Sequence, residues 1–260
     1  MPRIGFEDSV RLGRNVKYAR IHFNDSILLG NITKNDDKKY IIRIVADGTL
    51  TFDTNNVKNV KYEFENGDVL YGDDIVGRSV ANGEIIKVSG QDWKSGVPEL
   101  KCNNSILGSN LNEFPPLTHY ASFYNTSVSG DISALSNVTH WADFYNTSVS
   151  GDISALSNVT YLASFDNTSV SGDISALSNV THWANFGNTS VSGILSPHSN
   201  LKYLYLNGTN MSSNDTDQTI INLDNNTTVS GTLKVVANRT TASDSAFNSL
   251  VAKGWSITEV

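Results

Sequence analysis

Three histidines of this chain recur at a fixed position of a 21-residue repeat, an arrangement that could build a ladder of metal sites. They are His119, His140 and His182. Histidine is the commonest protein ligand for zinc and related metals, but the third copy of the repeat carries Tyr161 at this position, which interrupts the ladder. We therefore interpret these residues as neutral histidines at the starts of strands, and the sequence predicts no metal site.

Three aspartates form a second ladder. Asp131, Asp152 and Asp173 each follow a glycine in successive copies. Like charges about 5 Å apart repel each other, and a row of calcium ions would relieve that repulsion. The glycine-rich calcium-binding nonapeptide pattern is absent, so solvated turn residues are the favoured interpretation. The Asn-x-Ser/Thr triplets at Asn125, Asn137 and Asn146 are interpreted in the same way, as turn residues rather than glycan acceptors.

No set of residues points to catalysis. The chain has no Gly-x-Ser-x-Gly elbow and no glycine-rich phosphate loop, and its one cysteine, Cys102, has no histidine near it in sequence. We therefore expect a protein that is not an enzyme, with no catalytic residues and no cofactor. A glycan-cleaving enzyme is the alternative, because two carboxylates such as those of Asp143 and Asp166 could converge on a substrate.

Charge is distributed unevenly along the 260 residues. Residues 1–101 carry 15 Lys or Arg and 15 Asp or Glu, whereas residues 102–260 carry 4 against 11. Residues 102–201 contain no Lys or Arg. Binding to nucleic acid requires a basic surface, so we expect no nucleic-acid partner for the repeats. The sequence also predicts no secretory signal, no transmembrane segment and no membrane insertion.

The elements that position these side chains follow from the repeat. The sequence Asn-Thr-Ser-Val-Ser-Gly-Asp-Ile-Ser-Ala-Leu-Ser-Asn-Val-Thr starts at Asn125, Asn146 and Asn167, and a shorter copy starts at Asn188. A constant period of this length is typical of stacked repeat proteins, in which one unit cannot bury its own apolar residues. The positions predicted to face inward in the first unit are Ala121, Phe123, Val128, Ile132, Leu135 and Val138.

Residues 1–98 have a different pattern. Ala19, Ile21 and Phe23 alternate with polar residues, as in a half-buried strand. The dipeptides Asp47-Gly48, Asn66-Gly67 and Asn82-Gly83 lie between apolar runs and predict hairpins. We therefore expect a small antiparallel β domain that serves anchoring or assembly, followed by a linker and N-terminal cap over residues 99–117.

The spacing Leu201-x-x-Leu204-x-Leu206-x-x-Thr209-x-Met211 resembles the leucine-rich repeat. In the identical copies Ala and Phe stand where that family prefers Leu, and Thr126, Thr147, Thr168 and Thr189 stand at the position of its internal Asn or Cys. The resemblance implies one short parallel strand per unit on one face of a solenoid, here over residues 118–240. Irregular or tightly helical turns would lie behind it.

The last residues are predicted to cap the solenoid. Ser243 is placed to cap a helix over Asp244 to Lys253, and Gly254 stands where a helix would stop. Trp255 and Ile257 then alternate with polar residues in a final strand. The expected fold class is thus mainly β: an antiparallel β domain, a capped leucine-rich-repeat-like solenoid with a parallel sheet, and a short C-terminal helix in the cap over residues 241–260.

Differences between the copies predict a ligand-binding face. If Ala121 and Phe123 face inward, the residues beside them face outward, and these are the positions that vary. The back-side residues repeated unchanged are Ser127, Ser129, Ser133, Ser136 and Asn137. Aromatic residues interleaved with short polar ones suit recognition of a sugar chain or a protein. The other interpretation is that recent duplication left few differences and that the aromatics only stabilise neighbouring strands. The predicted face consists of Tyr120, Ser122, Tyr124, Trp141, Asp143, Tyr145, Leu162, Ser164, Asp166, Trp183, Asn185, Tyr203 and Tyr205.

These patterns together predict a structural or interaction protein. Near-identical units rich in Ser, Thr and Asn resemble leucine-rich-repeat proteins of bacteria and bacteriophages. That resemblance implies a head or tail fibre or decoration component on a virion surface, with a surface glycan or protein as ligand and other subunits bound through residues 1–98. A bacterial adhesin or binding protein is the alternative, and whether the chain forms a homo-oligomer stays open.

Overall fold

The computed structural model describes residues 40–44, 48–49, 60–75, 77–89, 97–101, 108–114 and 116–260. All of them belong to one compact unit, residues 40–260. The strand predicted around Ala19 to Phe23 and the solitary Cys102 lie outside the described residues.

The first part of the described chain is an antiparallel sheet of four strands in the order β1-β6-β3-β4. Alternate residues of β3 are buried, among them Tyr62 and Phe64, as expected of a strand with one face on a core. A separate ladder joins β2 to β5. The elements are β1 (Tyr40–Arg43), β2 (Gly48–Thr49), β3 (Lys61–Phe64), β4 (Val69–Tyr71), the 3-10 helix η1 (Gly72–Ile75), β5 (Ser79–Val80) and β6 (Ile85–Ser89).

Of the three predicted hairpins, one is confirmed. Strands β3 and β4 pair across Asn66-Gly67, where Gly67 takes a φ of +89°. Among the described residues β1 pairs with β6 and β2 with β5, while most of the hairpin predicted at Asp47-Gly48 lies outside the described residues. Asn82-Gly83 forms a turn, but β5 and β6 pair with other strands, so it is not a hairpin. Local turn signals identified the turns but not the longer-range pairing.

Strand β1 is bonded to the segment that precedes the repeats. The Arg43 backbone N–H donates to Ser109 Oγ at 2.8 Å, and Gly108 N–H donates to the Arg43 carbonyl at 3.0 Å. The Arg43 side chain also donates to Glu113 Oε1 from Nε at 2.7 Å. Glu113 belongs to the 3-10 helix η3 (Leu111–Glu113), whose start is capped by the Asn110 side chain.

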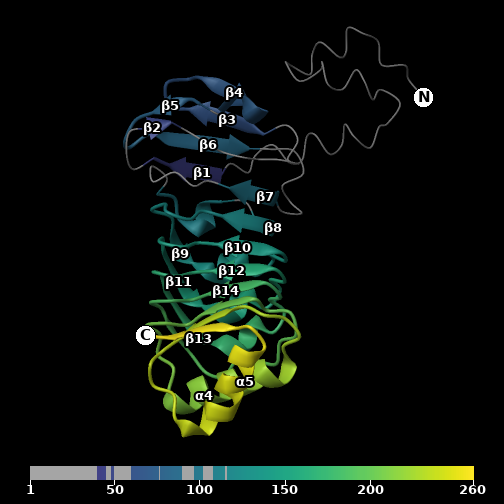
Figure 1. Cartoon of the computed structure of the whole chain (residues 1–260). Helices are drawn as coiled ribbons and strands as arrows, with labels where there is room; N and C mark the ends of the chain where they lie inside the picture. The colour runs from purple at the N-terminus through teal and green to yellow at the C-terminus, as the bar shows by residue number, and fades with distance from the viewer. Residues whose placement is uncertain are drawn as a thin grey trace, which may run out of the picture. The chain divides into compact units, whose positions relative to one another are not determined.

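The repeats form a parallel sheet of eight strands in the order β18-β17-β16-β14-β12-β10-β8-β7. Neighbouring units pair residues that are one repeat apart, so Trp141 lies between Tyr120 and Leu162. Figure 1 shows β8, β10, β12 and β14 one above the other. The strands are β7 (Val97–Lys101), β8 (Leu117–Ser122), β10 (Trp141–Asp143), β12 (Leu162–Ser164), β14 (Trp183–Asn185), β16 (Tyr203–Tyr205), β17 (Thr232–Val235) and β18 (Ser256–Glu259).

A second parallel sheet, which the sequence analysis did not predict, lies where irregular turns were expected. It has the order β15-β13-β11-β9. Its strands pair with a different offset, since Ser150 lies opposite Ser169 rather than opposite the equivalent Ser171. Identical residues are therefore not directly opposite each other in this sheet. The elements are β9 (Ser129–Asp131), η4 (Ile132–Leu135), β11 (Ser148–Asp152), η5 (Ile153–Leu156), β13 (Ser169–Asp173), η6 (Ile174–Leu177) and β15 (Ser190–Ser192).

The positions predicted to face inward fill the space between the two sheets. Ala121, Phe123 and their counterparts in the next three units have no solvent exposure. The phenylalanine rings stack along the units, with Phe144 5.5 Å from Phe123 and 5.4 Å from Phe165 between ring centroids. The repeating arrangement of short parallel strands around one apolar interior is compatible with a solenoid, as the period predicts.

The threonines at the predicted internal ladder are buried and bonded within their own unit. The Oγ1 of Thr126 donates to the Phe123 carbonyl at 2.6 Å, and Thr147 and Thr168 repeat this bond. Thr209 does the same with the Leu206 carbonyl. The hydroxyl thus satisfies a carbonyl at the turn that follows each strand.

An asparagine makes this turn possible in every copy. Asn125, Asn146, Asn167 and Asn188 have φ between +53° and +57°, a left-handed conformation that Asn tolerates better than other non-glycine residues. The side chains also bond between units, since Asn146 Nδ2 donates to Asn125 Oδ1 at 3.1 Å. The interpretation of Asn125 and Asn146 as turn residues is confirmed.

The C-terminal end contains two α-helices, α4 (Ser213–Asn226) and α5 (Asp244–Ala252). The sequence predicted α5 and its glycine stop, and Gly254 has a φ of +88°. It did not predict α4, which begins with reciprocal bonds between Ser212 and Asp215 and buries Ile220 and Leu223. A polar sequence with few apolar residues concealed this helix, which lies within the range 118–240 predicted as the solenoid.

A buried carboxylate connects the two helices. Asp217 of α4 accepts hydrogen bonds from the Thr240 backbone N–H, Thr240 Oγ1 and Ser243 Oγ. Ser243 stands at the N-cap position of α5 but makes no side-chain bond to the helix, because its hydroxyl is used by Asp217. Burial alone would raise the pKa of Asp217, but these bonds and the charge of Arg239 outweigh it and lower the pKa.

Replacing Asn146 by Ala is expected to lower the free energy of unfolding by about 1–2 kcal/mol, because Ala takes the left-handed conformation at a cost and lacks the bond to Asn125. Asn146→Gly should recover most of the loss. Urea unfolding followed by circular dichroism measures this, with the exposed Ser150→Ala as control. Equal stability of the Ala and Gly variants would contradict the backbone explanation.

Asp217→Asn tests the helix junction. The folded pKa of Asp217 is depressed, so its ionised form contributes stability above the ordinary carboxyl pKa of about 3.9, and this is lost as pH falls through the folded pKa. Thermal melts should show the variant less stable than wild type at pH 7 and the difference shrinking below about pH 4. A difference that does not change with pH would show that the charge of Asp217 is not involved.

Candidate binding face

The predicted binding residues lie in three rows on the outer face of the eight-stranded sheet, and we call this surface the binding face. The register places Tyr120, Trp141, Leu162, Trp183 and Tyr203 side by side in the first row. The second row contains Ser122, Asp143, Ser164, Asn185 and Tyr205. The third row follows the strands and contains Tyr124, Tyr145 and Asp166, which backbone bonds keep in line.

Burial supports the predicted inward and outward directions. Ala142 and Phe144 have no exposure, whereas Trp141 and Asp143 are half-buried and Tyr145 is 37% exposed. Three of the thirteen residues contribute little surface: Ser122, Leu162 and Ser164 are 6%, 8% and 7% exposed. Their side chains are shorter than those of their neighbours in the same rows. A ligand on the face would therefore reach the neighbours and have little direct access to these three residues.

Two columns of rings run along the face. His119, His140, Tyr161 and His182 are stacked, with centroids 4.8–5.1 Å apart and interplanar angles of 8–24°. This column occupies the position where a metal ladder was considered, and Tyr161 continues the stack. The pKa of His140 is lowered, because partial burial disfavours the charged ring and the neighbouring His119 would repel it.

The second column joins the first. Tyr120 stacks on Trp141 at 5.0 Å and 14°, and Trp141 also packs against Tyr161 at 5.8 Å. Beyond Leu162, Trp183 packs on Tyr203 at 4.5 Å and meets Tyr205 edge-on. These contacts make one continuous band of rings on the binding face.

Two carboxylates stand in the centre of the binding face. Burial raises the pKa of Asp143, against opposing bonds from the Tyr145 backbone N–H and Ser164. Burial also raises the pKa of Asp166, against bonds from Asn188 and Asn167 and the charge of Lys234. Among the described residues neither carboxylate forms an ion pair. Both ionised groups therefore reduce the stability of the fold.

The aspartate ladder on the other sheet has a structural role. Asp131, Asp152 and Asp173 are exposed, and each accepts a bond from the backbone N–H two residues later, at the start of a 3-10 helix. They are thus solvated, as predicted, but they end strands β9, β11 and β13 and are not turn residues. Within the described ranges, no group of three or more His, Cys, Asp or Glu is arranged to hold a metal ion.

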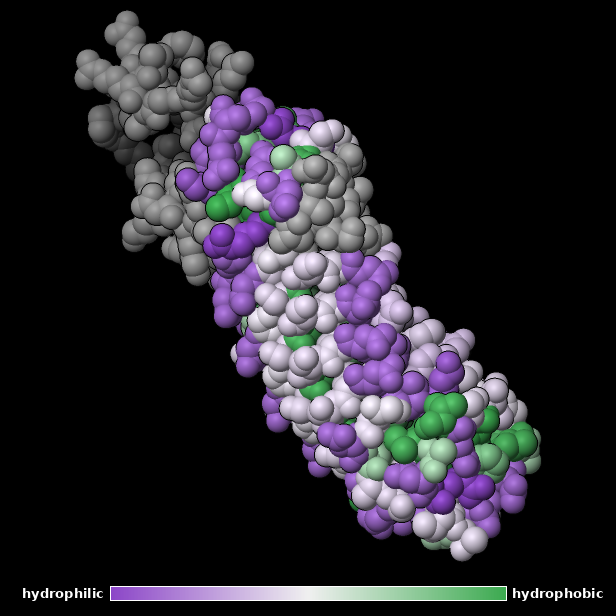
Figure 2. Space-filling model, turned by 90° about the vertical axis from the view of Figure 1, so that its left-hand side faces the viewer, coloured by the Kyte–Doolittle hydropathy of each residue, from purple (hydrophilic) through white to green (hydrophobic). Residues whose placement is uncertain are grey.

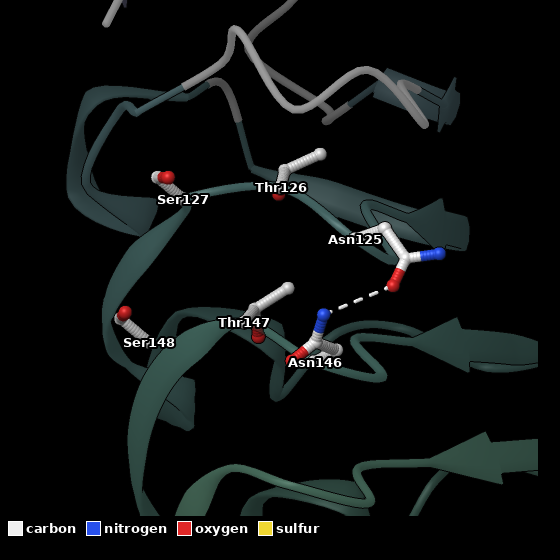
Figure 3. A pocket seen from close by; sticks show the side chains of 6 residues that line it. All are labelled: Asn125, Thr126, Ser127, Asn146, Thr147 and Ser148. Carbon is white, nitrogen blue, oxygen red and sulfur yellow. Dashed lines mark hydrogen bonds between the residues drawn. The ribbon is translucent and has the colours of Figure 1, made fainter.

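A polar hollow of about 350 Å³ lies between the turns of the first two copies. In Figure 3 the amide of Asn146 points to that of Asn125, while Ser127 and Ser148 lie at the other end. Thr126 and Thr147 line the space between them. These six residues are identical in the two copies, so the hollow lacks the variation that marks the binding face.

The remaining surface is mostly regular. Figure 2 shows rows of similar hydropathy running along the stacked units, and apolar residues gathered at the end that carries the C-terminal helices. Val251 and Val260 are the most exposed large apolar residues of that end, at 49% and 59%. In the part of the chain that the structure describes, no helix combines the length and apolar character required to cross a bilayer.

No protein-family profile, no curated protein and no solved structure matches this chain.

Asp143→Asn should make the protein more stable at neutral pH. The folded pKa is raised above the ordinary value of about 3.9, so ionisation of Asp143 costs stability above the folded pKa, and protonation removes that cost at lower pH. Melting temperatures at pH 7, 5 and 3 should show the variant above wild type at pH 7 and equal to it at pH 3. A lower melting temperature of the variant at pH 7 would mean that the carboxylate is a structural group.

Proposed function

We propose that the protein is a non-catalytic interaction protein whose stacked repeats form a leucine-rich-repeat-like solenoid and whose binding face recognises a partner. One observation carries this proposal. The copies differ at the outward positions of the eight-stranded sheet, while Ser133 and Asn137 and their counterparts, exposed on other surfaces, are repeated unchanged. Drift after duplication would change any exposed position. Among the first three copies the variation is confined to this face, which favours selection for recognition; the fourth copy also differs elsewhere, at Ile194, Pro197 and His198.

The composition of the face supports a binding role. Its half-buried Trp and Tyr rings provide contact area at a low entropic cost, since stacking already holds them in place. Asp143 and Asp166 are retained although burial disfavours their ionisation. Residues that reduce stability on an exposed face are candidates for function rather than for folding.

The proposed context is the surface of a virion, as a head or tail fibre or decoration component that contacts a host glycan or protein. It rests on the resemblance of the near-identical Ser-, Thr- and Asn-rich copies to bacterial and bacteriophage leucine-rich-repeat proteins. In this proposal residues 1–98 attach the chain to other subunits, and the repeats project the binding face. A bacterial adhesin with the same binding face is the alternative.

The triple variant Trp141→Ala, Tyr145→Ala and Trp183→Ala tests the proposal. Fluorescently labelled full-length protein is applied to a glycan array and to candidate bacterial cells, and bound fluorescence is measured. We expect the triple variant to lose at least tenfold in binding, because it removes the largest outward rings. Its melting temperature should fall only modestly, since ring pairs contribute about 0.5–1.5 kcal/mol each.

Tyr71→Ala is the matched control, because Tyr71 is an aromatic residue 57% exposed on the antiparallel sheet. This variant should bind as wild type does. If the triple variant bound as well as Tyr71→Ala, the repeats would act as a spacer and the proposed recognition role would be wrong.

A further inference from the structure

The orientation of the rings restricts what the binding face can hold. His140 lies between His119 and Tyr161, and Tyr161 lies between His140 and His182, each in a stacked arrangement. Both faces of these interior rings are therefore covered by other rings. Such rings can offer a partner only their edges.

Covered ring faces exclude the mode of binding that needs an open aromatic platform. The face of an aromatic ring carries the negative part of its quadrupole and the edge the positive part. A flat apolar ligand surface or a cation gains most from lying on an open ring face, and the interior of the column offers none. At this column a partner must instead contact ring edges and the groups beside them.

The charged groups beside the rings are arranged in a simple pattern. In the second row Asp143 stands near the centre, and the register places Lys234 of β17 beside Tyr205. Lys202 follows His182 in the ring column. Lys234 Nζ lies over the Tyr205 ring at 4.7 Å. Asp166, in the third row, is one strand from Asp143. The centre of the face is thus anionic and carries no cation of its own between residues 102 and 201.

We propose that the binding face takes an extended protein segment that carries basic residues at alternate positions, and that these cations pair with Asp143 and Asp166. The inference rests on the proposed binding function and names the chemistry of the partner. Ion pairing would return to both carboxylates the stabilisation that burial removes from their charged forms.

The spacing of the carboxylates fits this partner. Asp143 lies beside Ser164, and Asp166 is two residues further along the same chain. Asp166 lies in the turn after β12. One strand spacing of about 4.8 Å and at most two residues of strand rise at about 3.3 Å therefore place the two backbone positions no more than roughly 8 Å apart. In an extended segment, residues i and i+2 lie on one side and about 7 Å apart. Adjacent basic residues would point to opposite sides.

The test measures the affinity of the full chain for two labelled peptides of equal composition by fluorescence anisotropy. One peptide, Gly-Thr-Arg-Thr-Arg-Thr-Gly, alternates its arginines, and the other, Gly-Thr-Arg-Arg-Thr-Thr-Gly, places them side by side. We expect saturable binding of the alternating peptide, at least fivefold weaker binding of the other, and weakening when salt is raised from about 20 to 150 mM. No saturable binding of the alternating peptide, or equal affinity for the two, would overturn the inference.

Two double variants with the same change in charge assign the binding site. Asp143→Asn with Asp166→Asn should weaken the alternating peptide at least tenfold. Asp152→Asn with Asp173→Asn, on the other sheet, should change the affinity by less than twofold, and Asn retains the capping role at those positions. Equal effects of the two double variants would reject Asp143 and Asp166 as the site.

A neutral β-linked glucose hexasaccharide in the same assay separates this inference from the proposed function. If the sugar binds, and the variant lacking Trp141, Tyr145 and Trp183 loses it while the aspartate variants keep it, the binding face is real but its partner is a glycan, and this inference fails. If instead the variant lacking Trp141, Tyr145 and Trp183 binds cells as wild type does, the proposed function fails as well.

Discussion

The structure depends on one constraint: in strands β8, β10, β12 and β14, every side chain lies one strand spacing from the side chain 21 residues away. A residue is therefore acceptable only if it packs well against a near-copy of itself at about 5 Å. Phenylalanine satisfies this by ring stacking, and asparagine by donating its amide to the next amide. A column of lysines or arginines would repel itself, which gives a physical reason for their absence from residues 102–201.

The same constraint explains where a binding function can develop. Inward positions must fit a closed interior, and turn or strand-end positions must allow the left-handed backbone of Asn146 or the capping bond of Asp152. The outward positions of the eight-stranded sheet have neither requirement, so they can differ from unit to unit. Asp143 and Asp166 occur singly in their rows, next to Ser, Asn, Tyr or Gly in neighbouring units, which avoids a column of like charges. Their burial cost is acceptable in a stack whose stability comes from its interior.

The sequence predicted those features that depend on local pattern and period. The inward positions follow from the period, the Asn66-Gly67 hairpin and the α5 helix with its Gly254 stop from local turn and cap residues, and the parallel strands from the resemblance to the leucine-rich repeat. It did not predict the second sheet, because Ser-Val-Ser-Gly-Asp is short and contains a glycine with φ of +107° to +117°, features of a turn. Helix α4 was missed because its mostly polar sequence hides the spacing of Thr216, Ile220 and Leu223. The mutual covering of the rings depends on register and rotamers, which no sequence pattern reveals.

The most direct test of this account exchanges the outward residues of one unit for those of the next, as Trp141→Leu, Asp143→Ser and Tyr145→Asp in a single chain. The measurement is the free energy of unfolding in urea, compared with that of Phe144→Ala. We predict that the exchange costs less than about 2 kcal/mol, the value of one or two ring contacts, whereas Phe144→Ala costs about 3–5 kcal/mol. A larger loss from the outward exchange than from Phe144→Ala would show that the varied row holds the stack together and is not free to serve recognition.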